Sequence, residues 1–213
     1  MRGAISAPVH HLVPLPYSHH DLILKHMTTS TVVRKNNQVA IAADRLTTFG
    51  DTRLSSRYET NSKIFKVKDT FIGIAGSSAH HHVVENALRK LDAPRFGSKE
   101  EVFATMVALH PLLKEHFFLN PKEEDDDPYE SSHYIMVLAN PSGIYGVYSY
   151  REVFAFDRFW SIGSGRAFAL GAMYAAYDKA RTAREVADIG VAAGCEFDKN
   201  SAGPIAMHVM KTK

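Results

Sequence analysis

The chain has 213 residues, 45% of them hydrophobic and 23% charged, which indicates one globular domain large enough for a substantial core. Its formal net charge of +2 gives no basis for nucleic-acid or membrane-surface binding, and no apolar run approaches the about 20 residues that span a bilayer. Cys195 is the only cysteine, which excludes intrachain disulfides and CxxC metal sites and fits a reducing, cytoplasmic location.

Residues 1–27 differ in composition from the rest of the chain. They contain several prolines and histidines but few charges, and their apolar runs are shorter than the about 7–15 residues of a secretory signal core. We interpret residues 1–27 as a propeptide or as upstream sequence from a start codon assigned too early. Residues 28–213 are then the folded domain.

Short strands dominate the first part of this domain. Residues 27–34 and 38–45 are rich in β-branched side chains and flank a polar turn at residues 35–37, which predicts a hairpin. Residues 46–52 are expected to form a polar loop. Alternating or continuous apolar runs predict further strands at residues 63–67, 70–76, 134–139, 144–148, 158–162 and 205–210.

Two pairs of helices are expected between these strands. Ser77 or Ser78 can cap a helix that ends before Pro94, and Ser98 can cap a second helix that Pro111 should kink or split. The other pair is expected at about residues 167–180 and 183–194. Because the strands cluster instead of alternating with helices, we predict an α+β fold in which two antiparallel sheets pack together under outer helix pairs.

Two clusters contain residue types that can bind metals, but the spacing of their residues does not suit a metal site. Residues 123–127 are five consecutive acids without ligand spacing, and they are interpreted as a solvated loop. His80, His81 and His82 are consecutive on a helix, so their side chains point in three directions and cannot converge on one ion. We interpret them as helix-surface histidines and expect neither a metal nor a cofactor.

Thr28 stands at the start of the first predicted strand, and Asp44 lies one hairpin away. A threonine hydroxyl is a poor nucleophile unless a base lies beside it. If the mature chain begins at Thr28, its own α-amine becomes that base. A nearby ammonium group would lower the pKa of this amine from about 8 toward neutrality.

Four motifs in this order resemble a proteasome-type β subunit of the N-terminal nucleophile hydrolases, most of all the bacterial proteasome homologues and the HslUV peptidase. The resemblance covers the chain from Thr28 onward. The motifs are Thr28-Thr29, residues 42–45 with Thr47-Thr48, residues 74–79, and residues 162–165. The resemblance implies the four-layer αββα sandwich of that family, in agreement with the predicted layers.

The resemblance also assigns roles to single residues. It implies that Thr28 is the nucleophile and that Asp44 pairs with the catalytic lysine, Lys63. This alignment needs about three extra residues in the loop before Lys63, and Lys66 is the alternative. By the same resemblance, the Gly76 N–H forms the oxyanion hole, and the network around the terminal amine consists of Ser164, Asp198 and Ser201.

The resemblance places a substrate pocket beside this site. The residues expected to bind substrate are Thr47, Thr48, Ile74, Ser78 and His82. Ile74 would fill the pocket floor, and no carboxylate would pair with a basic side chain. We therefore expect cleavage after small to medium apolar residues and slow cleavage after Lys or Arg.

The function implied is a threonine endopeptidase that hydrolyses proteins and peptides inside a homo-oligomeric double ring of about 12 or 14 subunits. The resemblance also leaves room for an AAA+ ATPase unfoldase as a partner. Two alternatives are a non-catalytic ring or scaffold subunit, and an N-terminal nucleophile amidase that acts on small amides. Retention of the whole residue set opposes a scaffold, which has no use for it.

Overall fold

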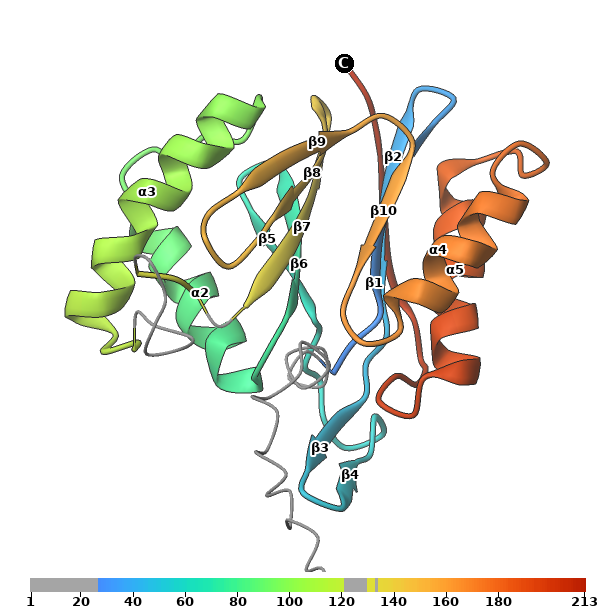
Figure 1. Cartoon of the computed structure of the whole chain (residues 1–213), viewed down its shortest axis with the longest axis horizontal. Helices are drawn as coiled ribbons and strands as arrows, with labels where there is room; N and C mark the ends of the chain where they lie inside the picture. The colour runs from blue at the N-terminus through green and yellow to red at the C-terminus, as the bar shows by residue number, and fades with distance from the viewer. Residues whose placement is uncertain (1–26, 121–129, 133) are drawn as a thin grey trace, which may run out of the picture.

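A computed structural model of the chain describes residues 27–120, 130–132 and 134–213 (Figure 1). The acidic run at residues 123–127 and residues 1–26 of the interpreted propeptide lie outside the described residues. The elements in chain order are β1 (Ser30–Lys35), β2 (Gln38–Ala43), β3 (Thr47–Phe49), β4 (Thr52–Leu54), β5 (Ile64–Val67), β6 (Thr70–Ala75), α2 (Ser78–Lys90), α3 (Lys99–His116), β7 (Ile135–Asn140), β8 (Gly143–Val147), β9 (Val153–Phe156), β10 (Phe159–Ile162), α4 (Arg166–Ala176), α5 (Ala183–Phe197) and β11 (Ala206–Lys211).

These elements form four layers, as predicted. One sheet has the order β10-β1-β2-β11 and the other β5-β6-β7-β8-β9, with antiparallel pairing throughout. Figure 1 shows the two sheets face to face, with α2 and α3 outside one of them and α4 and α5 outside the other. The predicted αββα sandwich is therefore confirmed.

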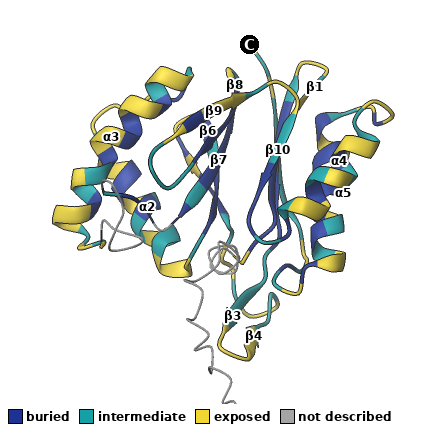
Figure 2. Cartoon of the chain, in the orientation of Figure 1, coloured by how far each residue is buried: buried dark blue, intermediate teal, exposed yellow. Residues whose placement is uncertain are grey.

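Three hydrophobic cores separate the four layers. Ile41, Val137 and Ile162 belong to the core between the two sheets. Larger side chains such as Leu88 and Leu109 fill the core between the five-stranded sheet and its helices. The core between the other sheet and its helices consists mainly of Ala and Val, with Met173. Figure 2 shows the buried residues on the inner faces and the exposed ones on the outer faces of the helices.

The first hairpin forms as its sequence predicts. Asn36 and Asn37 both have positive φ, 49° and 56°, a conformation that asparagine tolerates better than most residues. This two-residue turn fixes the register in which Ser30 lies opposite Ala43. Consequently Thr28 and Asp44, just beyond the two strands, lie at the same end of the sheet.

The structure differs from the sequence-based expectation in three places. Residues 46–52, expected to be a loop, lie mostly in a small separate hairpin of β3 and β4. Strand β9 was not expected. Pro111 does not split its helix, because α3 continues through it to His116. The partner carbonyl that Pro111 leaves without a donor belongs to Val107, which lies on an exposed face where water can hydrate it.

Candidate active site

Thr28 lies two residues before β1 and is only 2% exposed. Its carbonyl accepts a hydrogen bond from Gly165 N at 3.3 Å, and its nitrogen donates to Ser164 Oγ at 3.3 Å. That nitrogen is the amide of the Met27–Thr28 peptide bond, and it occupies the place of the free amine in a chain beginning at Thr28. Gly163 has φ +92°, and a Cβ there would lie 2.0 Å from the Thr28 carbonyl oxygen, so the close approach requires glycine.

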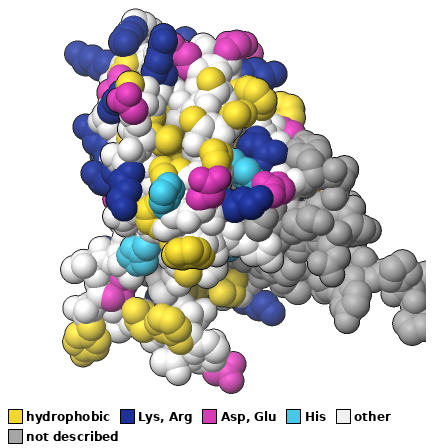
Figure 3. Space-filling view, turned by 90° about the vertical axis from the view of Figure 1, so that its left-hand side faces the viewer, with side chains coloured by type: hydrophobic (Ala, Val, Ile, Leu, Met, Phe, Trp, Pro, Cys, Tyr) yellow, Lys and Arg dark blue, Asp and Glu magenta, His cyan; other side chains and the backbone are white. Residues whose placement is uncertain are grey.

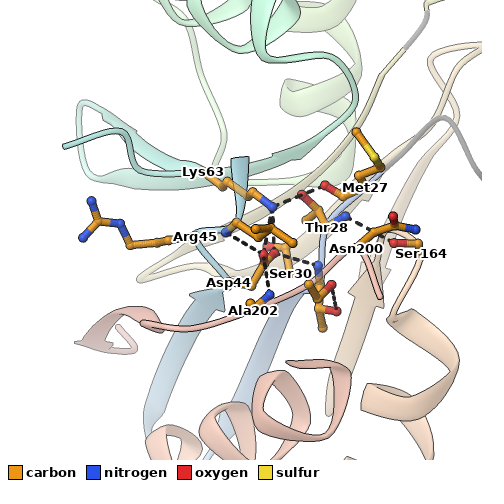
Figure 4. Close-up of polar contacts among 12 residues, drawn as sticks. Met27, Thr28, Ser30, Asp44, Arg45, Lys63, Ser164, Asn200 and Ala202 are labelled. Carbon is orange, nitrogen blue, oxygen red and sulfur yellow. Dashed lines mark hydrogen bonds and ion pairs between the residues drawn. The ribbon is translucent and has the colours of Figure 1, made fainter. Parts of the chain in front are cut away.

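Asp44 and Lys63 form an ion pair beside Thr28 (Figure 4). Lys63 Nζ lies 2.9 Å from both carboxylate oxygens of Asp44 and 3.3 Å from the Met27 carbonyl oxygen. Asp44 is fully buried, and it also accepts hydrogen bonds from the backbone N–H groups of Thr29, Leu46 and Ala202. Four donors therefore fix the carboxylate, and the carboxylate fixes the lysine ammonium.

Lys66, the alternative lysine, does not approach Asp44. It is exposed on β5, and its ammonium lies 5.1 Å from the centre of the Phe71 ring. Residues three apart on a strand point to opposite faces, which separates Lys66 from Lys63. The geometry thus favours the alignment with the longer loop before Lys63.

A second set of polar contacts reaches Thr28 from the other side. Asp198 Oδ2 accepts a hydrogen bond from Ser164 Oγ at 2.6 Å and another from Ser201 Oγ at 2.7 Å. Ser201 Oγ also lies 2.7 Å from Thr29 Oγ1. This hydroxyl–carboxylate chain orients Ser164 toward the Thr28 nitrogen. The structure therefore brings together all six residues named as catalytic from the sequence.

A pocket of about 420 Å³ opens beside Thr28. Each residue predicted to bind substrate lines it, as do Lys63 and the predicted oxyanion residue Gly76; these binding residues are Thr47, Thr48, Ile74, Ser78 and His82. Ile74 is buried, whereas Ser78 and His82 are exposed. Gly76 has no side chain, so at this position only backbone faces the pocket that Thr28 also lines.

Sequence reasoning missed several residues of the pocket lining, among them Arg45, His81 and Asn200. Arg45 and Asn200 each adjoin a predicted site residue in the sequence, which was an available signal. His81 also adjoins a predicted site residue, His82, but successive helical residues point in different directions, so its pocket position depends on how α2 is rotated about its axis. The expectation of a surface histidine is wrong for His81, which is half-buried with its ring edge-on to Phe65 at 5.1 Å between centroids.

Burial shifts the pKa of two groups near the site. It lowers the pKa of His81, an effect that Glu85 opposes and His82 increases. Burial also raises the pKa of the Cys195 thiol to about 11, with a further rise from the Asp44 charge. His81 is therefore neutral at neutral pH, and the thiol of Cys195 is protonated.

Within the described ranges, no three His, Cys, Asp or Glu side chains lie close enough together to hold a metal ion. In the same part of the chain, every helix is too short or too polar to cross a bilayer.

The comparisons with known proteins agree with this architecture. A family model described as proteasome subunit matches residues 24–196. Comparison with curated protein sequences gives no match. A solved structure of BPH from Thiobacillus denitrificans is 40% identical, covers 87% of this chain and 99% of its own, and has a TM-score of 0.81.

Two further solved structures extend this picture. Thiobacillus denitrificans BPH in complex with epoxomicin is 39% identical, covers 87% of this chain and 100% of its own, and has a TM-score of 0.80. Eukaryotic HslV from Trypanosoma brucei is 21% identical over 86% of this chain and 99% of its own, with a TM-score of 0.64, a likeness of fold alone. The predicted resemblance to proteasome-type and HslV-like subunits is confirmed, and the chain belongs to the proteasome subunit family, with its N-terminal nucleophile hydrolase fold.

Proposed function

We propose that the chain is a threonine endopeptidase in which Thr28, freed of the residues before it, is the nucleophile. The observation that carries the proposal is the convergence of two polar systems on Thr28 at the mouth of a pocket. Lys63, held by Asp44, approaches from one side, and Ser164, held by Asp198, approaches from the other. Family membership supports a peptidase of this kind.

The proposed reaction passes through an acyl-enzyme. Thr28 Oγ attacks the peptide carbonyl while the α-amine takes the hydroxyl proton, and the same proton then goes to the departing amine. The Lys63 ammonium favours the unprotonated form of the α-amine. Gly76 N–H stabilises the oxyanion, a contribution of about 3–4 kcal/mol in comparable enzymes. Water then cleaves the Thr28 ester and restores the free hydroxyl.

The proposal requires processing at the Met27–Thr28 bond, because an acylated Thr28 nitrogen is an amide and cannot act as a base. Residues 1–27 are then a propeptide or an upstream segment, and residues 28–213 are the peptidase domain. Met27 before Thr28 suits removal by a methionine aminopeptidase where synthesis begins at Met27. The intact mass of the active protein tests this step, and active protein that retains residues before Thr28 would contradict it.

The exposed surfaces of the outer helices support assembly into a homo-oligomeric double ring of about 12 or 14 subunits. Phe103 and Val107 are about half exposed on α3, and Figure 3 shows hydrophobic side chains gathered on this face between basic ones. Phe168 and Phe197 are also exposed, with ring centroids 5.6 Å apart. We further propose a cytoplasmic location and an AAA+ unfoldase as partner. A native mass spectrum tests the ring, and a monomer at micromolar concentration would exclude it.

Substitution of Thr28 by alanine tests the nucleophile. Thr28→Ala should abolish hydrolysis of fluorogenic peptides. The number of subunits seen by native mass spectrometry should stay the same, since alanine alters little packing. Because a BPH structure contains epoxomicin, we also expect the wild-type chain to bind it and Thr28→Ala to lose that binding. Residual peptidase activity within about tenfold of wild type would remove Thr28 as nucleophile.

A further inference from the structure

The ionisable side chains around the pocket are all basic. Arg45, Lys63, His81 and His82 line it, and no carboxylate does so within the described part of the chain. An enclosed site of one charge sign selects substrate groups of the opposite sign. The pocket therefore binds a substrate carboxylate well only if these groups are charged and have no neighbouring anion that neutralises their charge.

Two of the four cations already have anions beside them. Lys63 pairs with the buried carboxylate of Asp44 at 2.9 Å. Arg45 lies 4.0 Å from a carboxylate oxygen of Glu59, and its N–H groups bond the backbone carbonyls of Asn61 and Glu59. The fixed charges at the pocket are therefore largely balanced, and they change little over the neutral pH range.

The two histidines differ, because imidazole is the side-chain group that changes charge between about pH 5 and pH 8. The rings of His81 and His82 lie 5.8 Å apart between centroids, at the same end of α2. The other group close to His81 is Glu85, one turn along the helix, whose carboxylate bonds Arg89 at 2.8 Å and does not line the pocket. Protonation of the histidine pair therefore adds charge that no neighbouring carboxylate in the pocket offsets.

We propose that His81 and His82 make the substrate choice of this pocket depend on pH. In neutral or alkaline solution the His81 ring is uncharged, and the pocket accepts apolar side chains before the scissile bond. In mild acid the protonated His81 ring adds positive charge to the pocket, which then also accepts glutamate or aspartate there. This inference rests on the proposed peptidase function.

The burial of His81 shapes this response. Its half-buried position against Phe65 lowers its pKa, so its proton binds only in acid. A charge that appears in a partly enclosed site acts on a substrate carboxylate more strongly than one in open solvent. His81 should therefore add its charge to the pocket only in acid solution.

The test compares two fluorogenic peptides that differ only in glutamate or glutamine before the cleaved bond. Their ratio of kcat/KM cancels every titration that acts on both peptides, including that of the Thr28 amine. Between about pH 8 and about pH 5.5 the glutamate carboxyl stays mostly ionised, since its ordinary pKa is near 4.3. We expect the glutamate-to-glutamine ratio to rise about fivefold in the wild-type protein, as one partly screened charge pair would give.

Variants assign the rise to the two histidines. His81→Phe keeps a ring against Phe65, and His82→Gln keeps a hydrogen-bonding side chain; the double variant should hold the ratio constant with pH. His116→Gln, on the exposed end of α3, should leave the rise unchanged. If His81→Phe does not fold, His82→Gln alone should still reduce the rise.

The outcomes separate this inference from the proposed function. A pH-independent ratio in active wild-type protein, or an equal rise in the double variant, would overturn the histidine assignment and leave the peptidase intact. Failure to cleave either peptide, or any other peptide, would overturn the proposed peptidase function and this inference with it.

Discussion

The two halves of the sandwich pack their helices in different ways. In the Thr28 half, made of β10, β1, β2, β11, α4 and α5, glycines let α5 approach the sheet closely. A Cβ at Gly194 would lie 2.3 Å from Thr29 Oγ1, and one at Gly190 would lie 3.3 Å from Thr31 Cγ2. In the α2–α3 half, made of β5 to β9 with those helices, large side chains such as Leu88 and Leu109 hold the helices against the sheet.

This difference matches what each half contributes to the site. The Thr28 half supplies Thr28, Asp44, Ser164, Asp198 and Ser201, whose mutual distances must be fixed closely for proton transfer. The α2–α3 half supplies Lys63 and Gly76 and much of the pocket lining. Close backbone packing thus supports the proposed reacting groups, while side-chain packing supports the elements that line much of the pocket.

The largest expected effect comes from the contact that joins the halves, the pair of Lys63 and Asp44. Lys63→Ala should reduce peptide hydrolysis at least about a hundredfold, because the Thr28 amine loses its cationic neighbour and Asp44 loses its counter-ion. Lys66→Ala, three residues further along and over Phe71, should leave activity unchanged. Inactivation by Lys66→Ala but not by Lys63→Ala would show that the loop before Lys63 was aligned wrongly.

Substitution of two helical glycines in the Thr28 half tests whether its close packing requires glycine. Gly194→Ala should lower the free energy of unfolding by about 1–3 kcal/mol and reduce activity, since the added methyl group would overlap Thr29. Gly171→Ala, in α4 with no atom within 4 Å of the added carbon, should stabilise by about 0.5–1 kcal/mol. Urea denaturation of both variants measures this contrast, and equal shifts would refute it.

For the pocket, much of which the α2–α3 half lines, we expect a smaller effect: cleavage rates that vary gradually with the residue before the scissile bond. At neutral pH we expect cleavage after small to medium apolar residues, and cleavage after arginine slower by about tenfold, since a cation would find no carboxylate among the described pocket residues. A fluorogenic peptide panel measures these rates. Highest turnover with arginine would show that this interpretation of the pocket is wrong.

The smallest effect on activity is expected from modification of Cys195, on α5. A rise of its pKa from 9.0 to about 11 cuts the thiolate fraction near pH 8 by about a hundredfold. Iodoacetamide should therefore modify the native protein far more slowly than the denatured chain, and activity should persist throughout. Rapid alkylation of the native thiol, followed by mass spectrometry, would contradict the raised pKa.

Much of the fold could be predicted because its signals are local. The asparagine turn of the first hairpin and the caps at Ser98 and Thr182 are each read within a few residues. Strands β3 and β4 could not be predicted, since three residues are too few for an alternating pattern to appear. The continuation of α3 through Pro111 depends on hydration of an exposed face, which the order of residues does not reveal.

The candidate-site residues that could be predicted from the sequence are those that belong to motifs arranged in a characteristic order along the chain. Thr28, Asp44 and Ser164 stand in recognisable sequence contexts, and the structure brings them together. The choice of Lys63 over Lys66 needed the strand geometry, because both lysines lie near the start of β5. The pocket position of His81 needed the packing of α2 against Phe65, which is a tertiary contact.

The pairing of β1 with both β2 and β10 has a consequence during protein synthesis. Thr28 emerges from the ribosome early, but its partner strand β10 and residue Ser164 follow more than a hundred residues later, and Ser201 later still. Non-local contacts of this kind form late and slowly. Under the proposed function, a nascent chain therefore exposes its threonine without the groups that would activate it, and hydrolytic capacity would appear only when nearly the whole chain is present.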